Sequence, residues 1–209
     1  MSVAAITIAV MSPTVINYDR EMGRWEPNAR GRLERAALEL YIERGFDETT
    51  VAEIARRAGL TERTFFRHFV DKREVLFWGA GALQDLLVSA VAGAPESATP
   101  LDATAAGLEA AAALLDERRE AARERQSVIA ANVNLQEREL IKLASLASAI
   151  ADALRRRGVG EPTASLTAEV GIAVFKIAFL RWVDVTNEQP FPELIRASLD
   201  DLRVVSAGS

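Results

Sequence analysis

The side chains best suited to chemistry lie in one stretch of the chain. This stretch, TTVAEIARRAGLTERTFFRHFVDKREVL, spans residues 49–76 and contains the only histidine of the sequence. Arginine can bridge two acceptors of a guanine base, glutamate can accept from cytosine, and threonine can bond phosphate or pack on a thymine methyl group. The chemistry that these residues could perform is therefore hydrogen bonding to a nucleic acid.

Two short predicted helices would position these side chains. Thr50-Val51-Ala52-Glu53 fits a capping box, in which a hydroxyl and a carboxylate satisfy the free N–H groups at a helix start. Gly59 suits a turn that needs a positive φ, and Thr61 is a second N-cap, whose helix should run to about residue 69. A helix-turn-helix is therefore predicted at about residues 51–70.

The outward face of the second short helix carries most of the candidate contacts to DNA. Phe65 and Phe69 are four residues apart and should point inward together, which leaves polar side chains outside. The candidates for base or phosphate contacts are Thr50, Thr61, Glu62, Arg63, Thr64, Phe66, Arg67, His68 and Lys72. The alternative is an ordinary solvated helical hairpin, in which His68 packs internally. Arg30 and Arg32 could reach the DNA backbone or could only solvate a helix start.

The rest of the chain also has a helical pattern, so the predicted fold class is all-α, with about nine helices. The first helix should span Ala29–Arg44, and a long helix should start at Asp71 and run to Gly93. Later helices are expected at about 101–116, 118–131, 135–157, 163–186 and 191–205. Residues 94–100 contain two prolines and are predicted to form a loop near a domain boundary.

Composition excludes several classes of protein. The 209 residues include no cysteine and one histidine, which excludes a disulfide framework, a thiolate metal site and a His-rich metal site. No glycine-rich phosphate-binding motif is present, so neither a cofactor, a metal nor an enzymatic activity is predicted. The net charge of −5 arises after residue 78, and the N-terminal part is the only part that is not acidic.

The predicted location is the cytoplasm, with no membrane partner. No apolar run is expected to reach the ~18–20 residues that a membrane span needs. Residues 1–28 are predicted to be a flexible leader and not a signal peptide, because the apolar first ten residues lack a basic region. Met1, Met11 and Met22 are alternative starts, and the sequence does not decide between them.

The stretch from the first helix to the start of the long one resembles the tetracycline-repressor (TetR) family of regulators. The resemblance covers about residues 29–88. The matching segments are Gly45-Phe46, Thr50-Val51-x-x-Ile54-Ala55, Ala58-Gly59-Leu60-Thr61, Thr64-Phe65-Phe66-Arg67-His68-Phe69, and Lys72 with Leu76. It implies that residues 61–64 and Arg67 approach the major groove and that His68 and Lys72 touch phosphate. The family often has tyrosine where this chain has Phe66, which can make only apolar contacts.

The resemblance also implies two domains, a DNA-binding domain at 29–75 and a ligand-binding and dimerisation domain at 76–209. The last two long helices would pair with a second copy. Their apolar candidates, for interface or core, are Val170, Val174, Ile177, Phe179, Leu180, Leu194, Ile195, Leu199 and Leu202. The candidates for effector binding are Trp78, Arg125, Asn132, Phe175 and Trp182, each with structural core as the alternative. Arg138-Glu139-Leu140 and Arg181-Trp182 resemble a branch with acyl-CoA-like ligands.

The predicted function is transcriptional regulation by a homodimer that binds a palindromic operator in double-stranded DNA. The protein would be a repressor that a small hydrophobic or acyl-CoA-like effector releases. The alternative is a helical adaptor that does not bind DNA, and a salt-dependent mobility shift with DNA would distinguish the two. The sequence does not give the operator, the effector or the sign of regulation.

Overall fold

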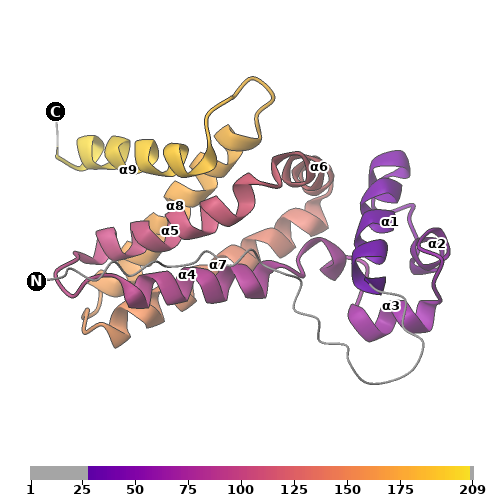
Figure 1. Ribbon diagram of the computed structural model, residues 1–209, viewed down its shortest axis with the longest axis horizontal. Coiled ribbons are helices and arrows are strands. Elements are labelled where there is room, and N and C mark those ends of the chain that lie inside the picture. Colours follow the sequence, from indigo (N-terminus) through magenta and orange to yellow (C-terminus); the bar gives the residue numbers. More distant parts are fainter. Residues whose placement is uncertain (1–27, 208–209) are drawn as a thin grey trace, which may run out of the picture.

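The computed structural model describes residues 28–207, which form nine α-helices, one 3₁₀ helix and no strand (Figure 1). The predicted all-α class is therefore confirmed. The helices are α1 (Ala29–Arg44), α2 (Val51–Arg57), α3 (Glu62–His68), η1 (Glu74–Leu76), α4 (Ala80–Gly93), α5 (Pro100–Asp116), α6 (Arg119–Ala130), α7 (Val133–Arg156), α8 (Thr163–Val183) and α9 (Phe191–Ala207). The predicted leader and the candidate starts Met1, Met11 and Met22 lie outside the described residues, apart from Asn28, which caps α1.

The first three helices form a small domain, here called the reader, whose core also includes side chains of the linker, α6 and α7. Leu33 and Leu40 of α1, Ile54 of α2 and Phe65 of α3 are at most 1% exposed. Thr50 and Glu53 make both bonds of the predicted capping box, and Gly59 takes a φ of 67° in the turn before α3. The predicted helix-turn-helix is thus present, built from local bonds around a shared apolar core.

The linker after the reader differs from its prediction. A single helix was expected from Asp71 to Gly93, but the chain forms the short η1, then turns at residues 77–79, and starts α4 at Ala80. Asp71 does act as a cap, since its Oδ1 accepts from the N–H groups of Arg73 and Glu74 at 2.8 and 3.1 Å. The cap is local and was predictable, whereas the break depends on contacts with a distant helix.

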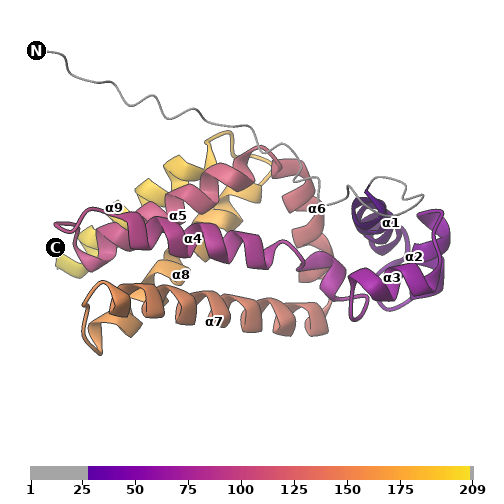
Figure 2. The same ribbon diagram turned by 60° about the horizontal axis from the view of Figure 1, so that its bottom comes forward.

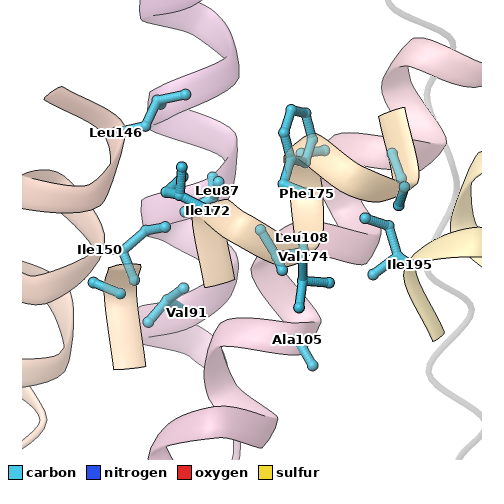
Figure 3. Packing of buried hydrophobic residues seen from close by; sticks show 14 of the residues in the cluster. Leu87, Val91, Ala105, Leu108, Leu146, Ile150, Ile172, Val174, Phe175 and Ile195 are labelled. Carbon is cyan, nitrogen blue, oxygen red and sulfur yellow. The ribbon is translucent and has the colours of Figure 1, made fainter. Parts of the chain in front are cut away.

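The remaining helices form the larger domain, a bundle in which α4 packs on α5 and α7, and α8 packs on α5, α7 and α9 (Figure 2). Its core brings together side chains from all these helices, among them Leu87, Leu108, Ile150 and Ile172 (Figure 3). Residues 94–99 connect α4 to α5 inside this domain, so they are not the boundary that the prolines suggested. Along this part of the chain the buried residues change from one core cluster to the other between Phe77 and Leu87, while the domain bounds 29–75 and 76–209 remain a prediction.

Two close helix crossings hold the bundle together. A Cβ atom on Gly171 of α8 would lie 2.6 Å from Thr104 Cγ2 of α5, and a Cβ on Gly107 would lie 2.8 Å from Val91 Cγ2 of α4. Real Cβ contacts are longer than this, so only glycine lets these helices approach so closely. α5 is therefore fixed against both α4 and α8.

Two segments, Glu74–Gly93 and Thr163–Val183, are long and apolar enough to cross a membrane by length and composition. The expectation that no such run exists is therefore wrong by this measure, because small residues and few charges raise the mean hydropathy of each segment. The first segment is interrupted by the turn at 77–79. The second is α8, whose inner face packs in the core through Phe175, Ala178 and Trp182.

Candidate nucleic-acid interface

α3 brings together the largest group of predicted contact residues. Phe65 anchors the helix in the core at 0% exposure, while the side chain of Phe66 next to it is 55% exposed. Glu62, Arg63 and Arg67 are also exposed. One short helix therefore presents an apolar ring and charged side chains of both signs, and its position is fixed by a buried aromatic residue.

The predicted threonine contacts already have partners within the chain. Thr61 Oγ1 accepts from Thr64 N at 3.2 Å and lies 3.0 Å from Thr64 Oγ1. Thr50 Oγ1 accepts from Glu53 N at 3.2 Å and donates to Glu53 Oε2 at 2.9 Å. These bonds cap α3 and α2, so any contact of the hydroxyls with phosphate has to be shared with the helix ends.

Lys72 has an internal role that the sequence did not suggest. Its Nζ donates to three backbone carbonyls, Phe46 O at 2.8 Å, Asp47 O at 3.2 Å and Thr49 O at 2.8 Å, and lies over the Phe46 ring. An ammonium group has three N–H donors. A contact with phosphate, as predicted, would require Lys72 to give up at least one of these bonds, and that contact remains a prediction.

His68 is partly buried, and its Nε2 atom is covered without a hydrogen-bond partner among the described residues. Burial lowers the pKa of this histidine, and the neighbouring charges of Arg67 and Arg30 lower it further. The neutral form is therefore favoured at neutral pH. This geometry favours the packing alternative, while its contact with phosphate remains a prediction.

Arg30, at the start of α1, is stacked on aromatic rings. Its guanidinium lies 4.9 Å from the ring centre of Trp78 and 5.8 Å from that of Phe69. The side chain therefore joins the start of α1 to the end of α3 and to the linker. Arg32 is only partly exposed. Neither arginine is simply a solvated residue at a helix start.

Carboxylates neutralise part of the positive charge of α2. Arg57 forms a two-pronged bond with Glu43 of α1, at 2.9 and 2.8 Å, and this bond lowers the pKa of Glu43. Arg44 donates to Glu53 at 2.7 Å. These pairs join α1 to α2, whereas α3 carries the charges that face outward.

The five predicted effector-binding residues do not line one cavity. Phe175 and Trp182 are buried in the core of the larger domain, with Trp182 at 0% exposure. The Trp182 ring is stacked on that of Phe191 at 4.7 Å, and its Nε1 donates to Asp116 Oδ1 at 2.9 Å. The same carboxylate oxygen accepts from Phe191 N at 2.8 Å. These aromatic residues serve as core in this structure.

The other three predicted effector residues lie where the reader meets the larger domain. Asn132 Nδ2 donates to Asp47 Oδ2 at 2.9 Å, and Arg125 Nε donates to Leu76 O at 2.7 Å. Trp78 lies in the linker and is 45% exposed. The polar groups that were expected to orient a ligand thus hold the two domains together.

Glu74 belongs to the same junction and was not predicted to have a role there. Its carboxylate is paired with Arg138 of α7 and accepts from Lys142 Nζ at 3.2 Å. Its partners lie 64 and 68 residues further along the chain. No local pattern in the sequence could have revealed such pairs.

The two described hollows are surface grooves that none of the five candidates lines. One, of about 270 Å³, lies between the loop after α3 and the start of α7 and includes Val70, Arg73 and Ile141. The other, of about 400 Å³, lies between α5 and α9 and includes Glu109, Arg196 and Leu199. Arg196 is paired with Glu109 across the second groove at 3.2 Å.

Comparisons with known proteins agree with this geometry. Residues 34–77 match the family described as bacterial regulatory proteins, tetR family. The transcriptional regulator TcmR of Streptomyces glaucescens is 37% identical over 81 residues, which cover 39% of this chain and 36% of TcmR. SrpR of Pseudomonas putida is 43% identical over 47 residues, 22% of each chain. The matched part thus spans about a third of the length of TcmR and less of SrpR.

Solved structures extend the likeness to the larger domain. FadR of Thermus thermophilus, a TetR-family repressor solved with lauroyl-CoA, is 25% identical, with a TM-score of 0.53 over 83% of this chain and 93% of FadR. FadR of Bacillus halodurans has a TM-score of 0.61 at 16% identity, over 86% of this chain and 96% of that one. Residues 34–77 are therefore similar to the tetR family, and the described chain has the fold of these solved regulators.

Proposed function

We propose that this protein is a transcriptional repressor that binds a palindromic operator through α3. The observation that carries the proposal is the contrast within α3, where a fully buried Phe65 fixes a helix whose Arg63, Phe66 and Arg67 face solvent. Arginine and an apolar ring are the groups that read guanine edges and thymine methyl groups. Glu62, Thr64 and the helix caps Thr50 and Thr61 complete the proposed surface, with His68 and Lys72 at its edge.

An adaptor without DNA binding would not need this surface. In α3 the buried Phe65 fixes the helix, while Arg63 and Phe66 are exposed at its surface. The relatives are transcriptional regulators, so we propose no enzymatic activity, no cofactor and a cytoplasmic location.

We further propose that the protein acts as a homodimer through the outer face of α8. Leu166, Ile177 and Leu180 are 62%, 55% and 48% exposed on this helix. They form one apolar stripe, with Val170 and Ala173 between them. A second copy would cover this stripe, which also accounts for the high hydropathy of α8 without a membrane. Of the other candidates, Val174, Leu194, Ile195 and Leu199 are buried as core, and Phe179 and Leu202 are partly buried against it.

A small hydrophobic effector is proposed for the larger domain. The support is analogy with FadR of Thermus thermophilus, solved with lauroyl-CoA, and with FadR of Bacillus subtilis, solved with stearoyl-CoA. In this chain the interior is filled by Phe175, Phe179, Trp182 and Phe191. An acyl chain would therefore have to displace packed aromatic rings. Phe175 and Trp182, the proposed effector residues among these rings, would have to move to admit it.

Selection from random double-stranded DNA, followed by mobility shifts at several salt concentrations, tests the DNA-binding proposal. A palindromic sequence should be enriched, and its affinity should fall linearly with salt on a log–log plot, because binding releases counterions from phosphates. An adaptor would enrich no sequence and would show no salt-dependent shift.

The dimer is tested by Ile177→Asp, which places a charge in the centre of the α8 stripe. Burying an unpaired carboxylate is costly, so the variant should be monomeric in analytical ultracentrifugation and should bind the operator at least about 100-fold more weakly. Val185→Asp is the matched control, because Val185 is 77% exposed but follows the end of α8. A monomeric variant with undiminished operator affinity would disprove the role of dimerisation.

A further inference from the structure

The linker between the two domains is wound more tightly than an α-helix. The N–H groups of Leu76, Phe77 and Ala80 each bond the carbonyl three residues back, at 3.0, 3.1 and 3.0 Å. In an α-helix each would bond the carbonyl four residues back. A 3₁₀-type segment in the path between two elements often marks a hinge.

Arg125 of α6 donates a hydrogen bond to a backbone carbonyl that would accept from the backbone in a continuous helix. In an α-helix through the linker, Leu76 O would accept from Ala80 N. Instead, Arg125 Nε donates to Leu76 O at 2.7 Å. The guanidinium also lies 4.9 Å from the ring centre of Phe77, and its Nη1 is 3.3 Å from Glu139 Oε1 of α7. One side chain thus joins the linker to two helices of the larger domain.

This bond is stronger than an ordinary contact between a side chain and the backbone. The Arg125 side chain is only 28% exposed, and burial lowers its pKa, against the effect of Glu139. A guanidinium stays protonated in proteins, so the bond to Leu76 O is charge-assisted and partly shielded from water.

The linker sequence is compatible with both the tight and the continuous form. Asp71 caps the segment as it would cap a helix, since its Oδ1 accepts from two N–H groups of the next turn. Gly79 opposes the continuous helix by about four- to fivefold relative to alanine, whereas Gly81 lies within α4 in the tight form as well. A Cβ on either glycine would meet no atom within 4 Å, so alanine fits at both positions.

We propose that Arg125 is a positioning residue for DNA binding, which holds the linker in its tight form and so fixes the reader on the larger domain. The proposal rests on the proposed function, because the position matters only if two readers must meet two half-sites. Rewinding the 3₁₀ residues 74–76 as α-helix would shorten the linker by about 0.5 Å per residue, about 1.5 Å in total, and would turn the reader. Half-sites on DNA are spaced by its helical repeat and do not follow such a change.

The distance between the domains tests the proposal without DNA. Because the chain has no cysteine, spin labels can be placed by Arg56→Cys in the reader and Ser148→Cys on α7, both at exposed positions. Labelled chains are diluted with unlabelled ones, so that only the pair within one chain is measured. Arg125→Met should shift or broaden the distance distribution by a few ångströms, and Gly79→Ala should shift it in the same direction.

Arg123→Met is the matched control, because Arg123 is also on α6 and its Nε donates to a carbonyl, Val183 O at 2.8 Å, inside the larger domain. It should leave the distance unchanged. Arg125→Lys should restore it, since an ammonium can donate to Leu76 O. Operator affinity should fall about tenfold in Arg125→Met and recover in Arg125→Lys.

An unchanged distance in Arg125→Met would overturn the proposal even if the wild-type chain binds its operator. A shifted distance with unchanged operator affinity would overturn the positioning role. If the wild-type chain binds no DNA while the distance shifts as expected, the proposed function fails and the hinge held by Arg125 stands.

Discussion

The reader and the larger domain are held in shape by different kinds of contact. In the reader, the bonds that set α2 and α3 join residues three apart, Thr50 with Glu53 and Thr61 with Thr64. In the larger domain, Asp116 bonds Phe191, 75 residues further on, and Asp102 bonds Arg203, 101 residues further on. The starts of α2 and α3 are therefore specified by neighbours, whereas these bonds of the larger domain join partners that only the fold brings together.

The largest expected effect belongs to the core of the larger domain. Trp182→Ala removes a fully buried ring that is stacked on Phe191, and should lower the free energy of unfolding by about 3–5 kcal/mol in urea titrations. Trp78→Ala is the comparison, because that ring is 45% exposed and should cost less. Equal losses of stability for the two variants would mean that the buried Trp182 ring contributes no more to the core than the half-exposed Trp78 ring does.

The second effect tests the internal role of Lys72 within the reader. Lys72→Met keeps the apolar stem but loses the ammonium that three carbonyls share, and should destabilise the reader by about 2–3 kcal/mol. The salt slope of operator binding should stay as in the wild type. A slope that is smaller by about 0.9, with stability unchanged, would instead establish the predicted phosphate contact.

The third effect is on base preference. Arg63→Ala and Arg67→Ala should each weaken operator binding by about 1–3 kcal/mol and relax the preference at one base pair, as expected when an arginine bridges a guanine. Affinities for the operator and for random DNA, measured side by side, separate base reading from phosphate contact. An equal loss on both DNAs would remove that arginine from the base-reading surface.

The smallest effect concerns Glu34, which lies on α1 where the reader packs against α6. Burial raises the pKa of its carboxyl to about 7, against the effects of a hydrogen bond with Trp78 and of the charges on Arg30 and Arg118. Unfolded glutamate titrates near ~4.3. The raised pKa means that its contribution to stability is complete below ~4.3 and is lost as the pH rises through about 7.

Glu34→Gln should therefore unfold at the same denaturant concentration as the wild type at low pH, and should be the more stable of the two at pH 8. Urea midpoints at several pH values measure this difference. A difference that does not change with pH would show that the Glu34 carboxyl does not titrate in this range.

The elements that could be predicted from the sequence are those fixed within a few residues. The two caps and the turn at Gly59 placed the helix-turn-helix, and the paired Phe65 and Phe69 gave the correct inward face. The later helices were placed to within a few residues, because their apolar stripes repeat at the helical period.

The linker and the proposed effector site could not be predicted in the same way. The expected long helix breaks at residues 77–79, next to the Leu76 carbonyl that accepts from Arg125, 49 residues away. Asn132 was assigned to a ligand because polar groups can fix the orientation of a ligand, but its partner in the structure is Asp47, 85 residues earlier. A polar residue among apolar ones indicates a specific bond, but the sequence does not say whether that bond is to a ligand or to another helix.

The long reach of the Asp116 bonds has a consequence for synthesis of the chain. Most of the reader's core and its Tyr41–Lys72 bond lie within residues 33–77, but Val128, Ile129 and Leu135 of α6 and α7 complete that core. Asp116 has to wait for Phe191 before α5 can be joined to α9. Since N-terminal domains generally fold first on the ribosome, each nascent chain can close its reader with α6 and α7 before it has the α8 helix through which copies would pair.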